Sequence, residues 1–236
     1  MSGLGAAARR RLRAQGGFTL VEMLMALLIG SIVLGAAMNI FMAGQRSSTR
    51  VQDRAESVQR GRVVMEQLTQ RIRSQVCLGP GYPAMTAGNS NGMTFYMDIG
   101  DENFRPQQMR LTYDASNGGQ VTETTWDMTP TGSGSGWQVA ASPSRVRVLA
   151  TNLALNGATP FFQFYSFTAT DPIAPTNLLP VPLSSGDLAR VVQVVLTFRP
   201  TPMRGDQNAF VSPLFQNQVY VRTADPTDPI HSPLCV

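Results

Sequence analysis

The sequence predicts an α+β protein in which one long N-terminal helix packs on an antiparallel β-sheet. An apolar run extends from Phe18 to Ala43 with Glu22 as its one charged residue, and helix-spaced apolar residues continue to about Cys77. The remainder contains short segments rich in β-branched and aromatic residues, separated by Gly, Pro, Asn and Ser. With 236 residues, we expect about one domain beyond the helix.

Residues 18–46 are expected to form the first, membrane-spanning half of the helix, because an apolar run of this length crosses a bilayer. An acidic residue within such a helix costs about 2.5–3.5 kcal/mol on insertion scales, so Glu22 is expected to have a partner and a function. Four arginines precede the run, namely Arg9, Arg10, Arg11 and Arg13. This bias predicts a single-pass segment in the cell membrane with a cytoplasmic N-terminus.

Residues 47–77 are expected to form an amphipathic second half whose apolar stripe packs on a globular domain. The stripe consists of Val51, Ala55, Val58, Met65, Leu68, Ile72 and Val76. Glycines lower helix propensity, so we expect gentle bends or close helix contacts at Gly30, Gly35, Gly44 and Gly61. The segment Leu78-Gly79-Pro80-Gly81 ends the helix.

Residues 78–236 are expected to form a β-rich headgroup. The expected strands are 93–97, 107–113, 121–126, 137–140, 145–150, 161–167, 190–198 and 218–222. Asn117-Gly118-Gly119 predicts a hairpin between two of them. Gly132–Gly136 predicts a flexible tip, and the Pro-rich stretches 171–186 and 200–213 predict loops.

The charge of the chain gives no sign of nucleic-acid binding. The formal net charge is +4, but four of the 19 basic residues lie before Phe18, which leaves 15 arginines against 15 acidic residues. A DNA-binding surface built from Arg145 and Arg147, with Arg110 and Arg222 near, is therefore a weak alternative to pairing with acidic neighbours.

The sequence shows no catalytic constellation, and we expect no enzyme activity and no cofactor. The single histidine, His231, lies in a Pro-flanked tail and is expected to be solvated. Gly132–Gly136 lacks the lysine and helix of a phosphate-binding loop. No metal site is predicted, although Asp98, Asp101 and Glu102 form an acidic turn that leaves calcium open as an alternative.

Two cysteines, Cys77 and Cys235, are expected to form one disulfide if the headgroup is exported to an oxidising compartment. Such a bridge would join the C-terminus to the end of the long helix. Two buried free thiols are the alternative.

The N-terminal segment Gly16-Gly17-Phe18-Thr19-Leu20-Val21-Glu22, after its arginines, resembles the class III signal of type IV prepilins and pseudopilins. The resemblance implies that residues 1–17 are a leader, which a prepilin peptidase removes after Gly17, and that the amino group of Phe18 is then methylated. It also implies that Thr19, Leu20 and Val21 line the assembly seam and that Glu22 pairs with the Phe18 amine of the neighbouring subunit. Two other interpretations of this segment account for less of it. An ordinary signal peptide has an apolar core of about 7–15 residues, which is shorter than the run from Phe18 to Ala43. A plain signal anchor would leave Glu22 without a partner.

The rest of the chain resembles GspJ/PulJ-type minor pseudopilins and PilW-type minor pilins through segments 60–73, 148–153, 162–165, 191–198 and 219–222. This resemblance implies a pilin-like fold and a non-enzymatic minor subunit that assembles into, or primes, a type IV pilus or type II secretion-like filament outside the cytoplasm. Its partners would be other pilin or pseudopilin subunits, the prepilin peptidase, an inner-membrane assembly platform and the lipid bilayer. The alternatives are a DNA-binding minor pilin of a DNA-uptake apparatus and an anchored surface domain that never polymerises.

Overall fold

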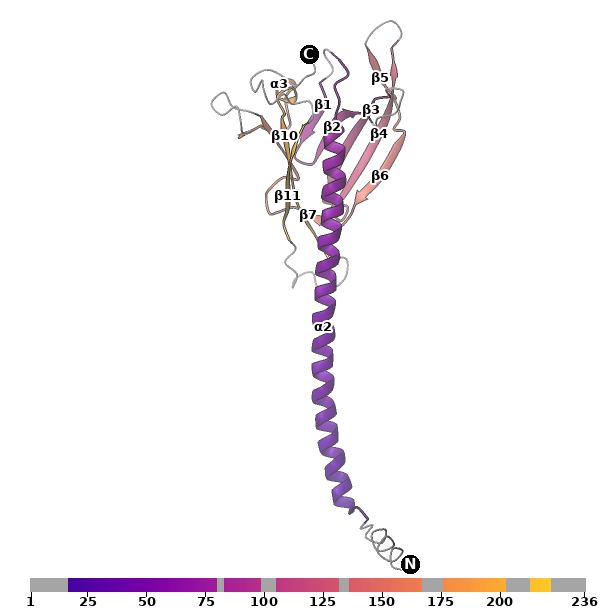
Figure 1. Cartoon of the computed structure of the whole chain (residues 1–236), viewed down its shortest axis with the longest axis vertical. Coiled ribbons are helices and arrows are strands. Elements are labelled where there is room, and N and C mark those ends of the chain that lie inside the picture. The colour runs from indigo at the N-terminus through magenta and orange to yellow at the C-terminus, as the bar shows by residue number, and fades with distance from the viewer. Residues whose placement is uncertain are drawn as a thin grey trace, which may run out of the picture. The chain divides into compact units, whose positions relative to one another are not determined.

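The computed structural model describes residues 17–79, 83–98, 105–131, 136–166, 176–202 and 213–221. The chain divides into two compact units, Met1–Val51 and Gln52–Val236. Both contain part of α2 (Leu20–Arg73), a continuous helix of 54 residues (Figure 1). It begins two residues later and ends four residues earlier than the expected span from Phe18 to Cys77.

In the first unit, the apolar part of α2 is exposed along its whole length. By length and composition the helix can cross a membrane. The helix expected over residues 18–46 is present from Leu20 onward.

In the second unit, α2 buries one face against the β-strands. The buried helix residues are Ser57, Gly61, Val64, Met65, Leu68 and Ile72. The predicted stripe is correct from Met65 to Ile72, but Val51 and Ala55 are exposed. The buried face begins at Ser57, and one turn later the Phe215 ring lies against the helix backbone at Gly61.

One antiparallel sheet has six strands in the order β1-β2-β3-β4-β5, with β6 also paired to β4. The strands are β1 (Met85–Asn89), β2 (Gly92–Met97), β3 (Gln107–Asp114), β4 (Gln120–Pro130), β5 (Trp137–Val139) and β6 (Arg145–Ala150). All but β1 were predicted. The β1 sequence Met-Thr-Ala-Gly-Asn contains residues that are depleted in strands, so propensity alone did not identify it.

The predicted turn between β3 and β4 is confirmed. Asp114 pairs with Gln120, and Gly118 and Gly119 have φ values of 64° and 63°. A Cβ at Gly119 would lie 1.6 Å from the Leu153 carbonyl oxygen. Glycine is therefore required both by the left-handed backbone and by the close approach of the neighbouring chain.

A second antiparallel sheet has five strands in the order β11-β10-β8-β9, with β7 paired to β10. The strands are β7 (Leu153–Ala154), β8 (Phe162–Ser166), β9 (Asn177–Leu178), β10 (Gln193–Pro200) and β11 (Phe215–Tyr220). A short helix, α3 (Ser185–Leu188), follows β9. The predicted α+β class is confirmed, while β9 and the start of α3 lie in the stretch 171–186 that was predicted as a loop.

A row of aromatic rings connects the two sheets. Ring centroids of Tyr113 and Phe161 are 4.7 Å apart, those of Phe161 and Phe198 are 5.5 Å apart, and those of Phe198 and Phe215 are 5.8 Å apart. Phe215 lies over the helix, where a Cβ at Gly61 would be 2.5 Å from its Cε2. The row thus runs from β3 of one sheet, across β10 and β11 of the other, to α2.

A buried carboxylate joins the helix to the six-stranded sheet. Glu123 on β4 has a side chain that is 2% exposed, and its Oε2 lies 3.0 Å from Arg71 Nε on α2 and 3.4 Å from Arg147 Nη2 on β6. A buried charge is tolerated when it is paired and hydrogen-bonded. Glu123 therefore fixes the last turns of α2 to two strands of the sheet.

We predict that Gly61→Val lowers the free energy of unfolding by about 1–3 kcal/mol, because the new side chain would overlap the Phe215 ring and overpack the core. Gly44→Val is the matched control, since a Cβ there meets nothing within 4 Å. Urea unfolding of the full chain in detergent measures both. Equal effects of the two substitutions would contradict the close contact at Gly61.

We predict that Glu123→Gln lowers the free energy of unfolding by about 1.5–3 kcal/mol, the usual contribution of hydrogen bonds to charged groups. Arg71 and Arg147 are 30% and 38% exposed, so both can regain water and the loss stays below that for two fully buried charges. The same unfolding measurement on Glu66→Gln, an exposed carboxylate on α2, provides the control. A loss no larger than that of the control would contradict the role assigned to Glu123.

Candidate functional site

The start of α2 is held by a reciprocal cap between Thr19 and Glu22. Thr19 Oγ1 accepts a hydrogen bond from the Glu22 backbone N–H at 3.2 Å, and the Thr19 N–H donates to Glu22 Oε2 at 3.4 Å. This is the capping-box arrangement, in which Ser or Thr is followed three residues later by Glu or Gln. The sequence analysis missed this role of Glu22, although the Thr-x-x-Glu spacing signals it.

The other residues of the processing and assembly segment point their side chains into solvent. Phe18, Leu20 and Val21 are 79%, 76% and 68% exposed, and Gly17 has nothing within 4 Å of its added Cβ position. The structure therefore brings Thr19 and Glu22 together, and the apolar side chains between and before them remain exposed to solvent. Residues 1–16 of the expected leader lie outside the described residues.

Several predicted positions lie partly or wholly outside the described residues. Cys77 follows the β-bridge between Gln75 and Met97, but its expected partner Cys235 is outside, as is His231. Of the acidic turn, Asp98 is described and half-buried, whereas Asp101 and Glu102 are not described. Within the described ranges, no group of three or more His, Cys, Asp or Glu residues could hold a metal ion.

The arginines considered for DNA binding do not share one face of the sheet. Arg147 on β6 lies opposite Glu123 on β4, and their side chains form an ion pair. Arg145 lies two residues away from Arg147 on the same face. Arg110 pairs with Thr124, which in turn pairs with Val146, so Arg110 lies on the opposite face. The expectation that Arg110 lies near Arg145 and Arg147 is therefore wrong, because side chains alternate between faces along a strand. Arg222 lies outside the described residues.

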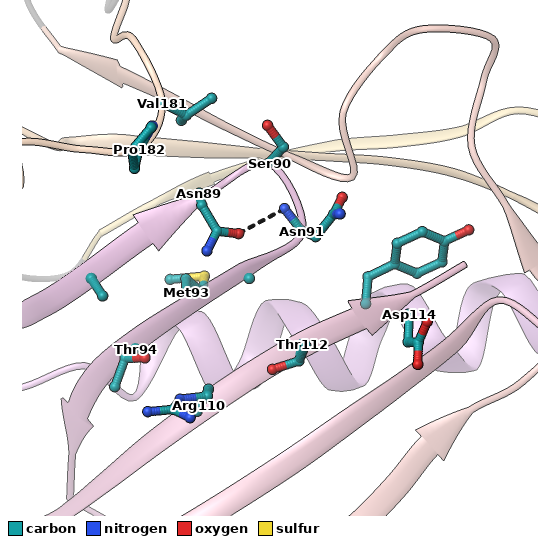
Figure 2. Close-up of a pocket in the computed structure, with 13 residues that line it drawn as sticks. Asn89, Ser90, Asn91, Met93, Thr94, Arg110, Thr112, Asp114, Val181 and Pro182 are labelled. Atoms are coloured by element: carbon teal, nitrogen blue, oxygen red, sulfur yellow. Dashed lines mark hydrogen bonds between the residues drawn. The ribbon is translucent and has the colours of Figure 1, made fainter. Parts of the chain in front are cut away.

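A hollow of about 790 Å³ lies on this opposite face, near the β1–β2 turn (Figure 2). Polar and apolar groups line it about equally, and Val181 and Pro182 form part of its apolar wall. The lining residues are Ala87, Asn89, Ser90, Asn91, Gly92, Met93, Thr94, Arg110, Thr112, Tyr113, Asp114, Val181 and Pro182. The sequence analysis did not anticipate this hollow, because it depends on pairing between strands distant in sequence and on the segment that precedes α3.

The floor of the hollow presents alternate residues of β3. Arg110, Thr112 and Asp114 lie along one face of the strand, as Figure 2 shows. Asp114 accepts hydrogen bonds from the Ser116 backbone N–H at 2.9 Å and the Ser116 hydroxyl at 2.7 Å. These bonds to the charged form lower the pKa of the Asp114 carboxyl below its usual value.

Tyr113, between these residues, points its ring into the core and donates from its hydroxyl to the Leu153 carbonyl oxygen at 3.1 Å. Burial, with a smaller effect from the Asp114 charge, raises the pKa of the Tyr113 hydroxyl. The tyrosine is therefore a neutral core residue, and the charged groups of the hollow are Arg110 and Asp114.

Comparison with family models finds that residues 12–38 match the prokaryotic N-terminal methylation motif. No curated protein matches the chain. The motif supports a type IV pilin-like precursor that a prepilin peptidase processes. Together with the exposed apolar part of α2, it supports anchoring in a membrane.

Proposed function

We propose that this chain is a non-enzymatic minor pilin or pseudopilin, cleaved after Gly17 and methylated at Phe18. It assembles into, or primes, a type IV pilus or type II secretion-like filament. The observation that carries the proposal is the methylation motif at residues 12–38, placed at the start of a helix that is apolar and exposed before it enters a β-domain.

The proposed organisation follows from which parts of α2 are covered. Residues 18–46 hold the precursor in the cell (inner) membrane and later pack against the same segments of other subunits. Residues 47–77 connect this segment to the headgroup at 78–236, and burial on the helix beginning at Ser57 supports the division. In this proposal the N-terminus is cytoplasmic before cleavage and the headgroup lies outside, where an assembly platform delivers it to the filament.

Glu22 has two roles in this proposal. Within the chain it caps α2 through Thr19 at 3.2–3.4 Å. Between subunits it neutralises the Phe18 amino group of a neighbour, and a paired charge in an apolar seam fixes the register of assembly. The two roles are compatible, because an ionised carboxylate has two oxygens and about four acceptor positions.

We also propose a disulfide between Cys77 and Cys235, which would tie the C-terminus to the segment after α2. The described part of the chain contains no free cysteine, which supports the proposal. A headgroup on the oxidising side of the membrane is the setting in which such a bridge persists.

The DNA-binding alternative has less support than the filament proposal. It relied on a cluster of arginines, but Arg147 is paired with Glu123 and Arg110 lies on the opposite face. From Phe18 onward the chain is neutral, and separated arginines provide little of the phosphate neutralisation on which DNA affinity depends.

We predict that the protein recovered from membranes begins at methylated Phe18 in cells that contain the prepilin peptidase, because residues 12–38 carry the methylation motif. In cells lacking the peptidase, the chain keeps its leader. Intact mass and N-terminal sequencing measure both. A leader retained in the presence of the peptidase, or a cut near the end of the apolar run, would reject the filament proposal.

We predict that Glu22→Gln leaves membrane insertion unchanged but removes the protein from filaments, because glutamine keeps the capping acceptor and loses the charge. Thr19→Ala is the matched variant, since it removes the cap, which contributes about 1 kcal/mol to helix stability, and keeps the charge. Membrane fractionation and the amount of protein in sheared filaments are the two readouts. If Glu22→Gln enters filaments normally while Thr19→Ala does not, Glu22 acts only as a cap and the charge pair is rejected.

A further inference from the structure

Arg110 is the exposed cation of the hollow, and the structure holds it in a defined orientation. Its guanidinium carbon lies 5.0 Å from the centroid of the Trp126 ring on the neighbouring strand. Among the described residues, no carboxylate forms an ion pair with it. A guanidinium stacked on an aromatic ring keeps its N–H edge free, and that edge matches the two oxygens of a carboxylate.

Hydroxyl groups flank this cation on the floor of the hollow. Thr94 pairs with Arg110 across β2 and β3, and Thr112 lies two residues further along β3 on the same face. Neither hydroxyl makes a hydrogen bond to another described residue. Both can donate to or accept from a ligand that lies along the strand.

The opposite end of the hollow is negative. Asp114 lies four residues from Arg110 on the same strand and face, a separation of about 13–14 Å at the rise of an antiparallel strand. Its two hydrogen bonds from Ser116 fix the carboxylate and favour its ionised form. The hollow therefore presents a cation, hydroxyl groups and an anion in a line.

We propose that this hollow binds a short extended segment of a partner protein, with an acidic side chain at Arg110 and a basic side chain four residues away at Asp114. An extended polypeptide repeats on one face every two residues, the same spacing as Arg110, Thr112 and Asp114. Its backbone groups meet the hydroxyls of the floor and the amides of Asn89 and Asn91, which form one side of the hollow.

A peptide fits this lining better than a sugar. Carbohydrate rings favour an exposed aromatic platform, whereas the Tyr113 ring stacks on Phe161 at 4.7 Å in the core. Trp126 is engaged by Arg110 and does not line the hollow. Val181 and Pro182 supply the apolar contact that an extended segment needs on its other side.

This proposal goes beyond the filament function and is independent of it. It uses residues of the second unit only, whereas processing and assembly use the segment from Gly17 to Glu22. If no peptide binds, the filament proposal still stands. If the chain is not processed, the peptide-binding proposal still stands.

The test is a titration of the full chain in detergent with the peptide acetyl-Glu-Thr-Gly-Thr-Arg-amide. The chain has two tryptophans, so in a Trp137→Phe background the fluorescence reports Trp126 beneath Arg110. We expect a saturable change with a millimolar Kd, and roughly two- to fivefold weaker binding when the glutamate of the peptide is replaced by glutamine. Backbone NMR shifts of Thr112 and Asn91 in the unmodified chain give a second readout that does not depend on the Trp137 substitution.

Arg110→Gln should abolish the preference for the glutamate peptide over the glutamine peptide. Arg145→Gln is the matched control, because it removes an exposed arginine from the opposite face of the same sheet. Equal binding of the glutamate peptide and the glutamine peptide, or an unchanged preference in Arg110→Gln, would overturn the proposal. Tighter binding of trigalacturonate than of the peptide would also overturn it and identify an acidic glycan as the ligand.

Discussion

The fold depends on how closely α2 approaches the strands at Gly61. The Phe215 ring occupies the space that any side chain at this position would fill, and that ring ends the aromatic row that begins at Tyr113. Because the row passes through both sheets, the contact between Phe215 and Gly61 links the position of α2 to that of both sheets. Against the described residues, the apolar part of α2 before this contact is exposed, and in the proposed filament it meets lipid or other subunits.

Glu123 is the buried anion between α2 and the six-stranded sheet. Its carboxylate pairs with Arg71 of α2 and Arg147 of β6, while Arg145 stays exposed on the same face. The opposite face keeps Arg110, which is stacked on Trp126 and has no ion-pair partner among the described residues. The chain from Phe18 onward has no excess of basic residues, and Arg110 is nevertheless an oriented cation in one hollow.

The sequence predicted the long helix, most strands and the β3–β4 turn, because each depends on local periodicity or on a turn that requires glycine. It did not predict β1, β7 or β9, which are short or have weak strand propensity and whose pairing comes from neighbouring chain segments. Nor did it predict the hollow, since residues 89–94, 110–114 and 181–182 meet only after both sheets have formed. The helix stripe was predicted from Val51, six residues before the first buried position, Ser57, because burial there falls on small residues, Ser57 and Gly61, that an apolar pattern does not mark.

The methylation motif and the capping box use the same residues for different purposes. Thr19 and Glu22 satisfy backbone groups that any helix start leaves unpaired. A peptidase that cuts just before this start would therefore release a helix that is already capped, with Phe18 and its new amino group just outside the cap. An uncapped helix would present unsatisfied N–H groups to the membrane, where water cannot replace the missing bonds. In the proposed filament, the carboxylate that forms this cap is the same one that pairs with the amine of a neighbouring subunit.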